Sequence, residues 1–330
     1  MIRHILFATA ALFFAGGGLR ASAHAGQSVL ADAQYDYNAG RYNRAVDALE
    51  SAVAKSPDDP SLHFLLGQCF YQLREFPRAA ASLERAVQLS PKDSQFHDWL
   101  GRSYGRRAEE SVFFGAMNWA RKTHREFEIA VELNPHDLEA QRDLIRFEMN
   151  APSVVGGGDD KAEKHIDALE KIDAMEAQLA RGEFFATKKR IPEADATFSK
   201  ILELDPDRAG VFFEVADYYG DRPNADKMAE AVDRATRIDP DDRRLKYYKG
   251  ILLVMQKKNP GEAEALLKSY VATVPDNSDL PPHAAALEWL GRLYESQGRF
   301  SEAAEEYRAS LAQDPHNKSV EEALKRVEKK

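Results

Sequence analysis

The chain has 330 residues, of which 45 are Lys or Arg and 54 are Asp or Glu, giving a net charge of −9. An acidic chain lacks the excess of cations that generic binding to nucleic acid or to anionic lipid requires, so we expect no nucleic-acid partner. A single cysteine, Cys69, excludes an internal disulfide, and its apolar neighbours predict a buried, inert thiol.

The N-terminus carries the parts of a secretory signal peptide. Arg3 lies in a short basic start, an apolar run covers residues 5–19, and small-residue A-x-A patterns end at Ala23 and Ala25. We therefore expect residues 1–25 to be a signal peptide, cleaved after Ala23 or Ala25, and the protein to be periplasmic. An uncleaved anchor is the alternative, although the run is shorter than the roughly 20 apolar residues that span a bilayer. We expect no membrane span in the mature chain.

A recurring proline gives the chain a period of about 34 residues. The prolines that follow an apolar helical pattern are Pro57, Pro91, Pro135, Pro206, Pro240, Pro275 and Pro315. Two of the intervals are 34 residues, and the longest, 71 residues, has room for two units. Upstream of the prolines, small and bulky apolar residues recur at offsets of four and three, which place them on one face of a helix.

A glycine followed three residues later by an aromatic residue recurs as well, for example Gly67 with Phe70 and Gly291 with Tyr294. We expect this glycine to lie where two helices cross. With LHFLLGQCFYQLREFPRAAASLERAVQLSP and ALEWLGRLYESQGRFSEAAEEYRASLAQDP, the chain resembles the tetratricopeptide repeat (TPR) family. The resemblance implies an all-α TPR-type solenoid, a right-handed superhelix of antiparallel helix pairs. We expect eight pairs followed by a capping helix at 319–330.

Two irregular segments interrupt the period. They divide the array into N-terminal units at 26–150, a glycine-rich linker loop at 151–160 and C-terminal units at 161–318. The first irregularity is an insertion near 107–120, whose apolar patch contains Phe113, Phe114 and Trp119. Either the helix that begins at Ser94 runs on, or a hydrophobic loop bulges out between the paired helices. We expect these side chains to pack onto adjacent helices; the alternative is an exposed partner-binding patch, because repeat insertions often map to the binding rim.

The linker loop contains three successive glycines followed by Lys161. A phosphate-binding loop would need Ser or Thr where Ala162 stands, and a strand before it. We therefore expect a turn and a helix cap in which Asp160 and Glu163 form a capping box. Together with RRAEESVFF and NWARK, this loop is similar to segments of exported proteobacterial TPR proteins, a likeness that implies the fold and export.

No pattern of residues indicates catalysis or metal binding. The nine histidines form no H-x-H or H-E-x-x-H pattern and no cluster with cysteine, and no G-x-S-x-G elbow is present. We therefore expect no enzymatic activity, no catalytic residue, no metal and no cofactor.

The TPR resemblance implies that partners bind in the concave groove, lined by the first helix of each pair. The residues expected to face it are Gln34, Tyr37, Asn38, Phe64, Gln68, Tyr71, Gln72, Arg102 and Arg106. Amides would bond the backbone of an extended peptide, tyrosines would stack on it, and arginines would hold a carboxylate. Leu30 and Gln34 stand where the family's carboxylate clamp needs a lysine and an asparagine, so chaperone-tail recognition is not expected. The alternative is that these groups are merely solvated.

These observations favour a periplasmic scaffold or adaptor that binds a protein or an extended peptide and serves envelope assembly. One alternative is a protein that binds a small ligand or a cell-wall fragment, with the insertion at 113–119 as a pocket wall. Another is a structural subunit of a secretion or export complex.

Overall fold

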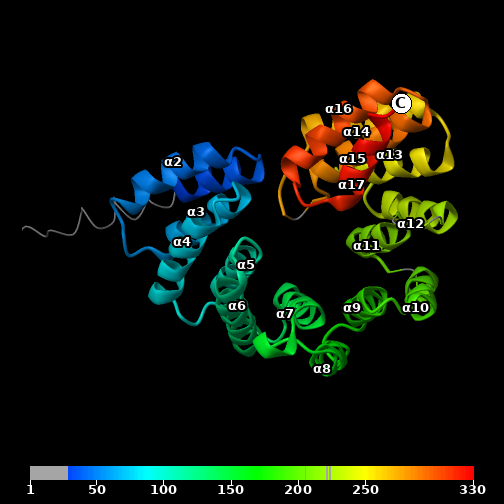
Figure 1. Cartoon of the computed structure of the whole chain (residues 1–330). Coiled ribbons are helices and arrows are strands. Elements are labelled where there is room, and N and C mark those ends of the chain that lie inside the picture. Colours follow the sequence, from blue (N-terminus) through cyan, green and yellow to red (C-terminus); the bar gives the residue numbers. More distant parts are fainter. Residues whose placement is uncertain (1–28, 205, 221, 223, 279) are drawn as a thin grey trace, which may run out of the picture.

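The computed structural model describes residues 29–330 except 205, 221, 223 and 279, so the expected signal peptide at 1–25 lies outside the described residues. The described chain consists of helices that pack as antiparallel pairs, and it contains no β-strand. Figure 1 shows the pairs following one another along a curved path. The all-α solenoid of helix pairs that the sequence predicts is confirmed.

Eight helix pairs and one terminal helix make up this described part of the chain. The first helices are residues 29–38, α3 (Pro60–Gln72), α5 (Ser94–Glu109), α7 (Leu138–Asn150), α9 (Ala174–Thr187), α11 (Ala209–Gly220), α13 (Leu245–Gln256) and α15 (His283–Ser296). The second helices are α2 (Tyr42–Val53), α4 (Phe76–Leu89), α6 (Phe113–Leu133), α8 (Asp159–Leu169), α10 (Ile191–Leu204), α12 (Ala225–Ile238), α14 (Pro260–Thr273) and α16 (Phe300–Gln313). The terminal helix α17 (Lys318–Val327) packs on α16.

Several of the recurring prolines are followed, two positions later, by a residue that caps the first helix of the next pair. The side chain of Asp59 accepts a hydrogen bond from a backbone N–H in the first turn of α3, and Asp93 and Asp137 do the same for α5 and α7. Asn317 caps α17 in the same way. Asp173 caps α9 although no proline precedes it at that spacing. Each such cap stabilises its helix by about 1 kcal/mol, so the start of a unit is fixed even where its proline is missing.

The recurring glycines lie where the two helices of a pair cross, as predicted. A Cβ atom placed on Gly67 would lie 2.5 Å from Cγ of Leu83, and one on Gly291 would lie 2.5 Å from the ring of Tyr307. Gly182 makes the same close approach to its neighbouring second helix. Only the absence of a side chain lets the helices come this close, and the bulky partner then fills the core of the pair.

The insertion near 107–120 lengthens the third helix pair. Helix α6 has 21 residues, and α5 runs on to Glu109. Val112, Phe113 and Phe114, at the connection between them, are 87%, 71% and 82% exposed. The expectation that the patch packs onto adjacent helices is wrong for Phe113 and Phe114, because no other helix covers the connection. It is confirmed for Trp119, whose ring centroid lies 5.2 Å from that of Tyr104 on α5.

The glycine-rich segment 151–160 contains the connection between α7 and α8, with a short 3-10 helix η1 (Ser153–Val155), and the first two residues of α8. Gly156 and Gly158 have φ angles of +112° and +152°, which glycine adopts without strain. Gly158 donates its N–H to the carbonyl of Glu148 and is itself the N-cap of α8. The expected capping box is wrong: the helix begins at Asp159, so Asp160 lies inside it, and no side chain bonds at the cap.

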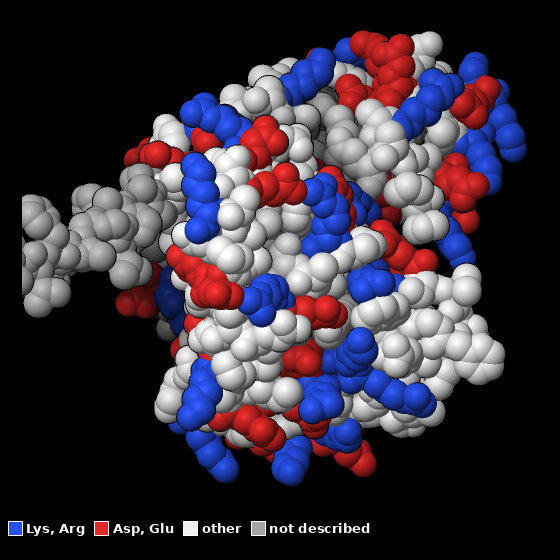
Figure 2. Space-filling model, turned by 90° about the vertical axis from the view of Figure 1, so that its left-hand side faces the viewer, with Lys and Arg blue, Asp and Glu red and all other residues white. Residues whose placement is uncertain are grey.

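The outer surface carries mixed charge. Figure 2 shows the molecule from the side of the N-terminal pairs, and acidic and basic side chains are interspersed over this face. Part of the pattern comes from ion pairs between the second helices of neighbouring pairs, such as Arg78 on α4 with Glu50 on α2 at 2.7 Å. Among the described residues, no helix combines the length and the apolar character that crossing a membrane requires.

Candidate binding groove

The first helices of successive pairs pack on one another and line the inside of the curve. Contacts join α3 to α5, α5 to α7, α7 to α9, α11 to α13 and α13 to α15. The curvature brings the C-terminal helices back towards the N-terminal ones (Figure 1). Two neighbouring cavities lie inside this curve, and side chains from both ends of the array line each of them.

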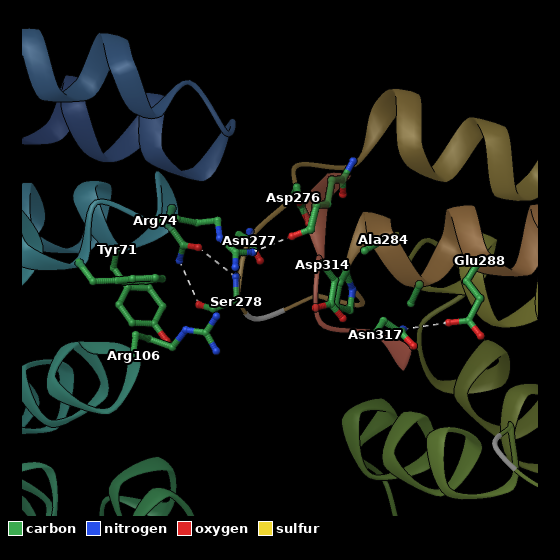
Figure 3. A pocket seen from close by; sticks show the side chains of 15 residues that line it. Tyr71, Arg74, Arg106, Asp276, Asn277, Ser278, Ala284, Glu288, Asp314 and Asn317 are labelled. Atoms are coloured by element: carbon green, nitrogen blue, oxygen red, sulfur yellow. Dashed lines mark hydrogen bonds between the residues drawn. The ribbon is translucent and has the colours of Figure 1, made fainter. Parts of the chain in front are cut away.

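The first cavity, of about 420 Å³, lies where the two ends of the array meet. Its N-terminal wall consists of Tyr71, Gln72, Arg74, Phe76 and Arg106. Its C-terminal wall consists of Asp276, Asn277, Ser278, Pro282, Ala284, Ala285, Glu288, Gln313, Asp314 and Asn317. Figure 3 shows Tyr71 and Arg106 on one side of the cavity and Asp314 and Glu288 on the other. Guanidinium groups thus lie on one wall and carboxylates on the other, with apolar side chains such as Phe76 and Pro282 also in the lining.

Polar contacts between distant parts of the sequence join the two ends. The amide oxygen of Gln72 accepts the backbone N–H of Ser278 at 3.0 Å, and its NH₂ group donates to the Ser278 hydroxyl at 3.0 Å. The hydroxyl of Tyr42 donates to the carbonyl of Asp276 at 3.3 Å. Arg74 donates to the carbonyl of Gln313 at 3.2 Å. The solenoid is therefore a closed ring, with its ends held mainly by hydrogen bonds to the main chain.

The second cavity, of about 500 Å³, is dominated by ion pairs of the inner wall. The guanidinium of Arg102 lies 2.9 Å from the carboxylate of Asp98, 2.6 Å from that of Glu139 and 2.5 Å from that of Asp143. Burial raises the pKa of Asp98 to about 8, against the lowering effect of Arg102. Three carboxylates already surround Arg102, and its side chain is only 12% exposed. Arg102 lines this cavity, as predicted, but acids of the wall already surround its guanidinium, so a partner's carboxylate would have to compete with them.

A second arginine of the inner wall, Arg142 on α7, extends this ion-pair network across three helix pairs. Its guanidinium makes two hydrogen bonds of 2.6 Å to Glu214 on α11. It also donates to Glu176 at 3.2 Å and to Glu183 at 3.1 Å, both on α9. The side chain of Arg142 is 8% exposed. Because bidentate arginine–carboxylate pairs are directional, this residue fixes how α7, α9 and α11 are placed relative to one another.

The predicted groove residues of the first pair lie outside the two cavities. Gln34 and Asn38 are exposed and bond to each other at 3.0 Å. Tyr37 is buried, and its hydroxyl accepts a hydrogen bond from Gln72 at 2.9 Å. Tyr37 therefore positions Gln72, and the prediction that it stacks on a partner is wrong.

The remaining predicted residues lie along α3 and α5. Phe64 packs between these helices, its ring centroid 4.6 Å from that of Phe96, and Gln68 is half-buried. The ring of Tyr71 lies edge-on against Trp99 at 5.5 Å, and burial raises the pKa of Tyr71. Tyr71 lines both cavities.

Arg106, the last predicted groove residue, pairs with Glu109 at 2.6 Å and keeps 36% of its side chain exposed. The structure thus brings Tyr71, Gln72 and Arg106 together at the first cavity. The insertion patch does not join them. Phe113 and Phe114 face solvent, which contradicts their expected use as a pocket wall.

Sequence reasoning missed Arg142 and Arg146, which line the second cavity. Their distance in sequence from the residue that caps the helix could have identified them. Asp98 and Arg102 lie five and nine residues after the cap Asp93, and Arg142 and Arg146 lie at the same two positions after Asp137. Ser278 was also missed, and no local pattern identifies it, because its contact with Gln72 joins residues 206 positions apart.

Two tetratricopeptide repeat models match the sequence, one at residues 30–94 and 216–278 and the other at residues 284–317. No curated protein matches it. Among solved structures, a chain of the APC/C hetero-tetramer Cut9-Hcn1 aligns with a TM-score of 0.50 and 13% identity, covering 94% of this chain and 57% of that one. At this level of identity the likeness concerns the fold alone.

Two bacterial structures align less closely. A thermophilic TPR protein of Thermus thermophilus has a TM-score of 0.47 and 18% identity, covering 69% of this chain and 99% of that one. A tetratricopeptide repeat protein of Parabacteroides merdae has a TM-score of 0.49 and 14% identity, covering 92% of this chain and 99% of that one.

Proposed function

Since this chain is built of tetratricopeptide repeats, we propose that it is a scaffold that binds a protein through an extended peptide segment on its inner wall. Stacked helix pairs provide a long concave surface, which is the feature that such repeat proteins use to hold partners. The observation that carries the proposal is the convergence of Tyr71, Gln72 and Arg106 on one cavity. The proposed role includes no catalytic step.

The chemistry of this cavity suits a peptide. The Gln72 amide can bond a main chain, the ring of Tyr71 offers an apolar face, and Arg106 offers a guanidinium for a carboxylate. Asp314 and Glu288, on the opposite wall, suit a cationic group of the same partner. A segment that carries both charges would be oriented across the cavity.

We further propose that the protein is exported to a bacterial periplasm and serves envelope assembly there. The basic start, the apolar run and the small-residue sites of residues 1–25 support export. A fusion of residues 1–40 to a reporter enzyme that is active only outside the cytoplasm tests this step. Loss of reporter activity in the fusion, when the same reporter is active behind a known signal, would exclude export.

Partner capture tests the scaffold. We expect a pull-down with the purified protein to recover a specific partner, and Arg106→Ala to reduce its recovery at least fivefold. Arg237→Ala is the matched control, because Arg237 also pairs with an acid on its own helix, Asp233 at 3.0 Å, but lies on α12 with its side chain 67% exposed. Equal recovery with both variants would remove the cavity from the proposal.

A second candidate is the binding of a small ligand or cell-wall fragment. The volume of the first cavity, about 420 Å³, supports it, because ligand pockets range from about 300 to 1,000 Å³. A thermal-shift screen discriminates the two candidates, since a bound small ligand raises the melting temperature by mass action. Arg106→Ala should abolish the rise.

A further inference from the structure

We propose that the segment Pro275–Ser278 occupies the place of a partner peptide, and that a partner binds by displacing it and opening the ring. The inference rests on the proposed function and names the partner class and the regulation of the same groove. The segment belongs to the loop between α14 and α15, and it lies against the N-terminal helices.

The contacts of this segment are those of a bound peptide. Its main chain is held at two points: the carbonyl of Asp276 accepts from Tyr42 at 3.3 Å, and the N–H of Ser278 donates to Gln72 at 3.0 Å. Both contacts are to the main chain, so they do not depend on the side chains of the segment, and Ser278 itself lies in a turn. The Gln72 amide thus bonds a main chain here, and that main chain is the protein's own.

Side-chain contacts at the two ends of the segment add selectivity. Pro275 lies against the bare backbone of Gly40, where an added Cβ would be 2.8 Å from the proline ring. Gly40 has a φ of +72°, so another residue there would be strained as well as too large. The Ser278 hydroxyl accepts a hydrogen bond from the Gln72 amide at 3.0 Å. The site thus contacts a proline ring and, three residues later, a side-chain hydroxyl.

The closure can be displaced because little apolar surface holds it. The hydrophobic cluster of the N-terminal pairs covers residues 33–79, and that of the C-terminal pairs covers residues 179–327, with no residue in common. Hydrogen bonds between neutral groups replace bonds to water and contribute modestly each, so a competing peptide with the same bonds can take their place. Arg74 and Arg106 on one wall of the adjoining cavity, and Glu288 and Asp314 on the other, favour a competitor that carries charges of both signs.

The partner class follows from these contacts. It is a peptide with a proline and, three residues later, a serine or threonine at a turn. Its backbone would replace that of Pro275–Ser278, and charged groups beyond these four residues would reach the arginines and the acids of the cavity.

A labelled peptide with the sequence of residues 272–278 tests the proposal. We expect it to bind the variant Ser278→Pro at least about tenfold more tightly than the wild-type protein, a difference of about 1.4 kcal/mol. Proline at this position removes both the N–H and the hydroxyl that Gln72 holds. The variant Ser278→Ala keeps the N–H, so its gain should be smaller. Fluorescence anisotropy of the labelled peptide measures both affinities.

Gln72→Leu in the Ser278→Pro background should weaken peptide binding at least about tenfold. Gln34→Leu is the matched control, because Gln34 is also an amide on a first helix but bonds to Asn38, and it should leave the affinity unchanged. Circular dichroism melting curves establish that each variant is folded.

Opening of the ring provides a second readout. Spin labels at Ser51→Cys on α2 and Ser319→Cys on α17, in a Cys69→Ser background, report the distance between the two ends. We expect this distance to increase with Ser278→Pro, and with saturating peptide on the wild-type protein. An unchanged distance, or equal peptide affinity of Ser278→Pro and wild type, would overturn the inference. Arg106-dependent partner capture would still stand in that case, so the two failures are distinguishable.

Discussion

Gly101 lies against the ring of Phe127, 26 residues later in the chain, and an added Cβ would be 2.6 Å from that ring. Gly67, Gly182 and Gly291 each meet a bulky residue only 16 positions later. Pro91 and Pro135 are 44 residues apart, ten more than the period of 34, so the difference equals the excess of the third unit. The insertion is therefore absorbed between the two crossing residues, at the hairpin ends of α5 and α6, and the crossing of the pair is preserved.

We expect Gly291→Ala to destabilise the protein by about 1–3 kcal/mol, because the new methyl group would overlap the ring of Tyr307. Gly210→Ala is the control. Gly210 is also helical, but a Cβ there meets nothing within 4 Å, so this variant should be neutral or more stable by up to about 1 kcal/mol. Urea unfolding followed by circular dichroism measures both changes. Equal effects would show that the crossing does not require glycine.

Arg142→Ala should lower the free energy of unfolding by about 1–2 kcal/mol, because it removes a buried guanidinium that joins three helices, although Glu176 keeps its pair with Arg208 and Glu214 is partly exposed to water. Arg237→Ala removes an exposed pair and should change it by less than about 1 kcal/mol. Thermal unfolding of the two variants side by side checks the difference. A loss no greater than that of Arg237→Ala would mean that the inner wall does not depend on its ion pairs.

The buried imidazole of His97 makes stability depend on pH. Burial tends to lower the pKa of His97, but its contacts with Glu126 at 2.6 Å and with the carbonyl of Pro91 at 3.1 Å outweigh this effect and raise it above 6.5. A group whose pKa is higher in the folded than in the unfolded state contributes its full stabilisation when the pH is below the unfolded-state pKa. This contribution is lost as the pH rises through the folded-state pKa.

The stability difference between wild type and His97→Gln should therefore be largest below about pH 6.5 and shrink at higher pH. Melting temperatures of both proteins between pH 5 and pH 9 measure it. A difference that grows with pH would contradict the assigned charge state.

Replacing Phe113 and Phe114 together with serine should change the free energy of unfolding by less than about 1 kcal/mol, because both side chains are exposed. Phe127→Ala, at a buried ring on the same helix, should cost about 3–5 kcal/mol. Chemical denaturation compares them. A large loss in the double variant would place the two rings in a packed environment.

The sequence predicts most of the fold because the repeat is local. Small residues such as Gly67 and Gly182, and the residues that meet them, recur within one unit, so a single unit already specifies its crossing. The predicted packing of Phe113 failed for the opposite reason. Its surroundings depend on whether another helix covers the connection, and the local pattern does not contain that information.

The candidate site was predictable only in part. The helical register brought Tyr71, Gln72 and Arg106 to the inner wall, as expected. The same register could not reveal that Arg102 is already surrounded, because Glu139 and Asp143 come from the next unit. Contacts between units require the curvature of the whole array, which accumulates from small rotations at each step.

Closure also constrains how many units the chain can contain. An open stack can gain or lose one hairpin while its distant units stay as they were. Here the carbonyl of Asp276 meets Tyr42 only because the seven pairs up to α14 complete the curve. Deleting any one of these hairpins would turn Asp276 away from Tyr42, so the number of repeats is set by the geometry of a circle as well as by the stability of each pair.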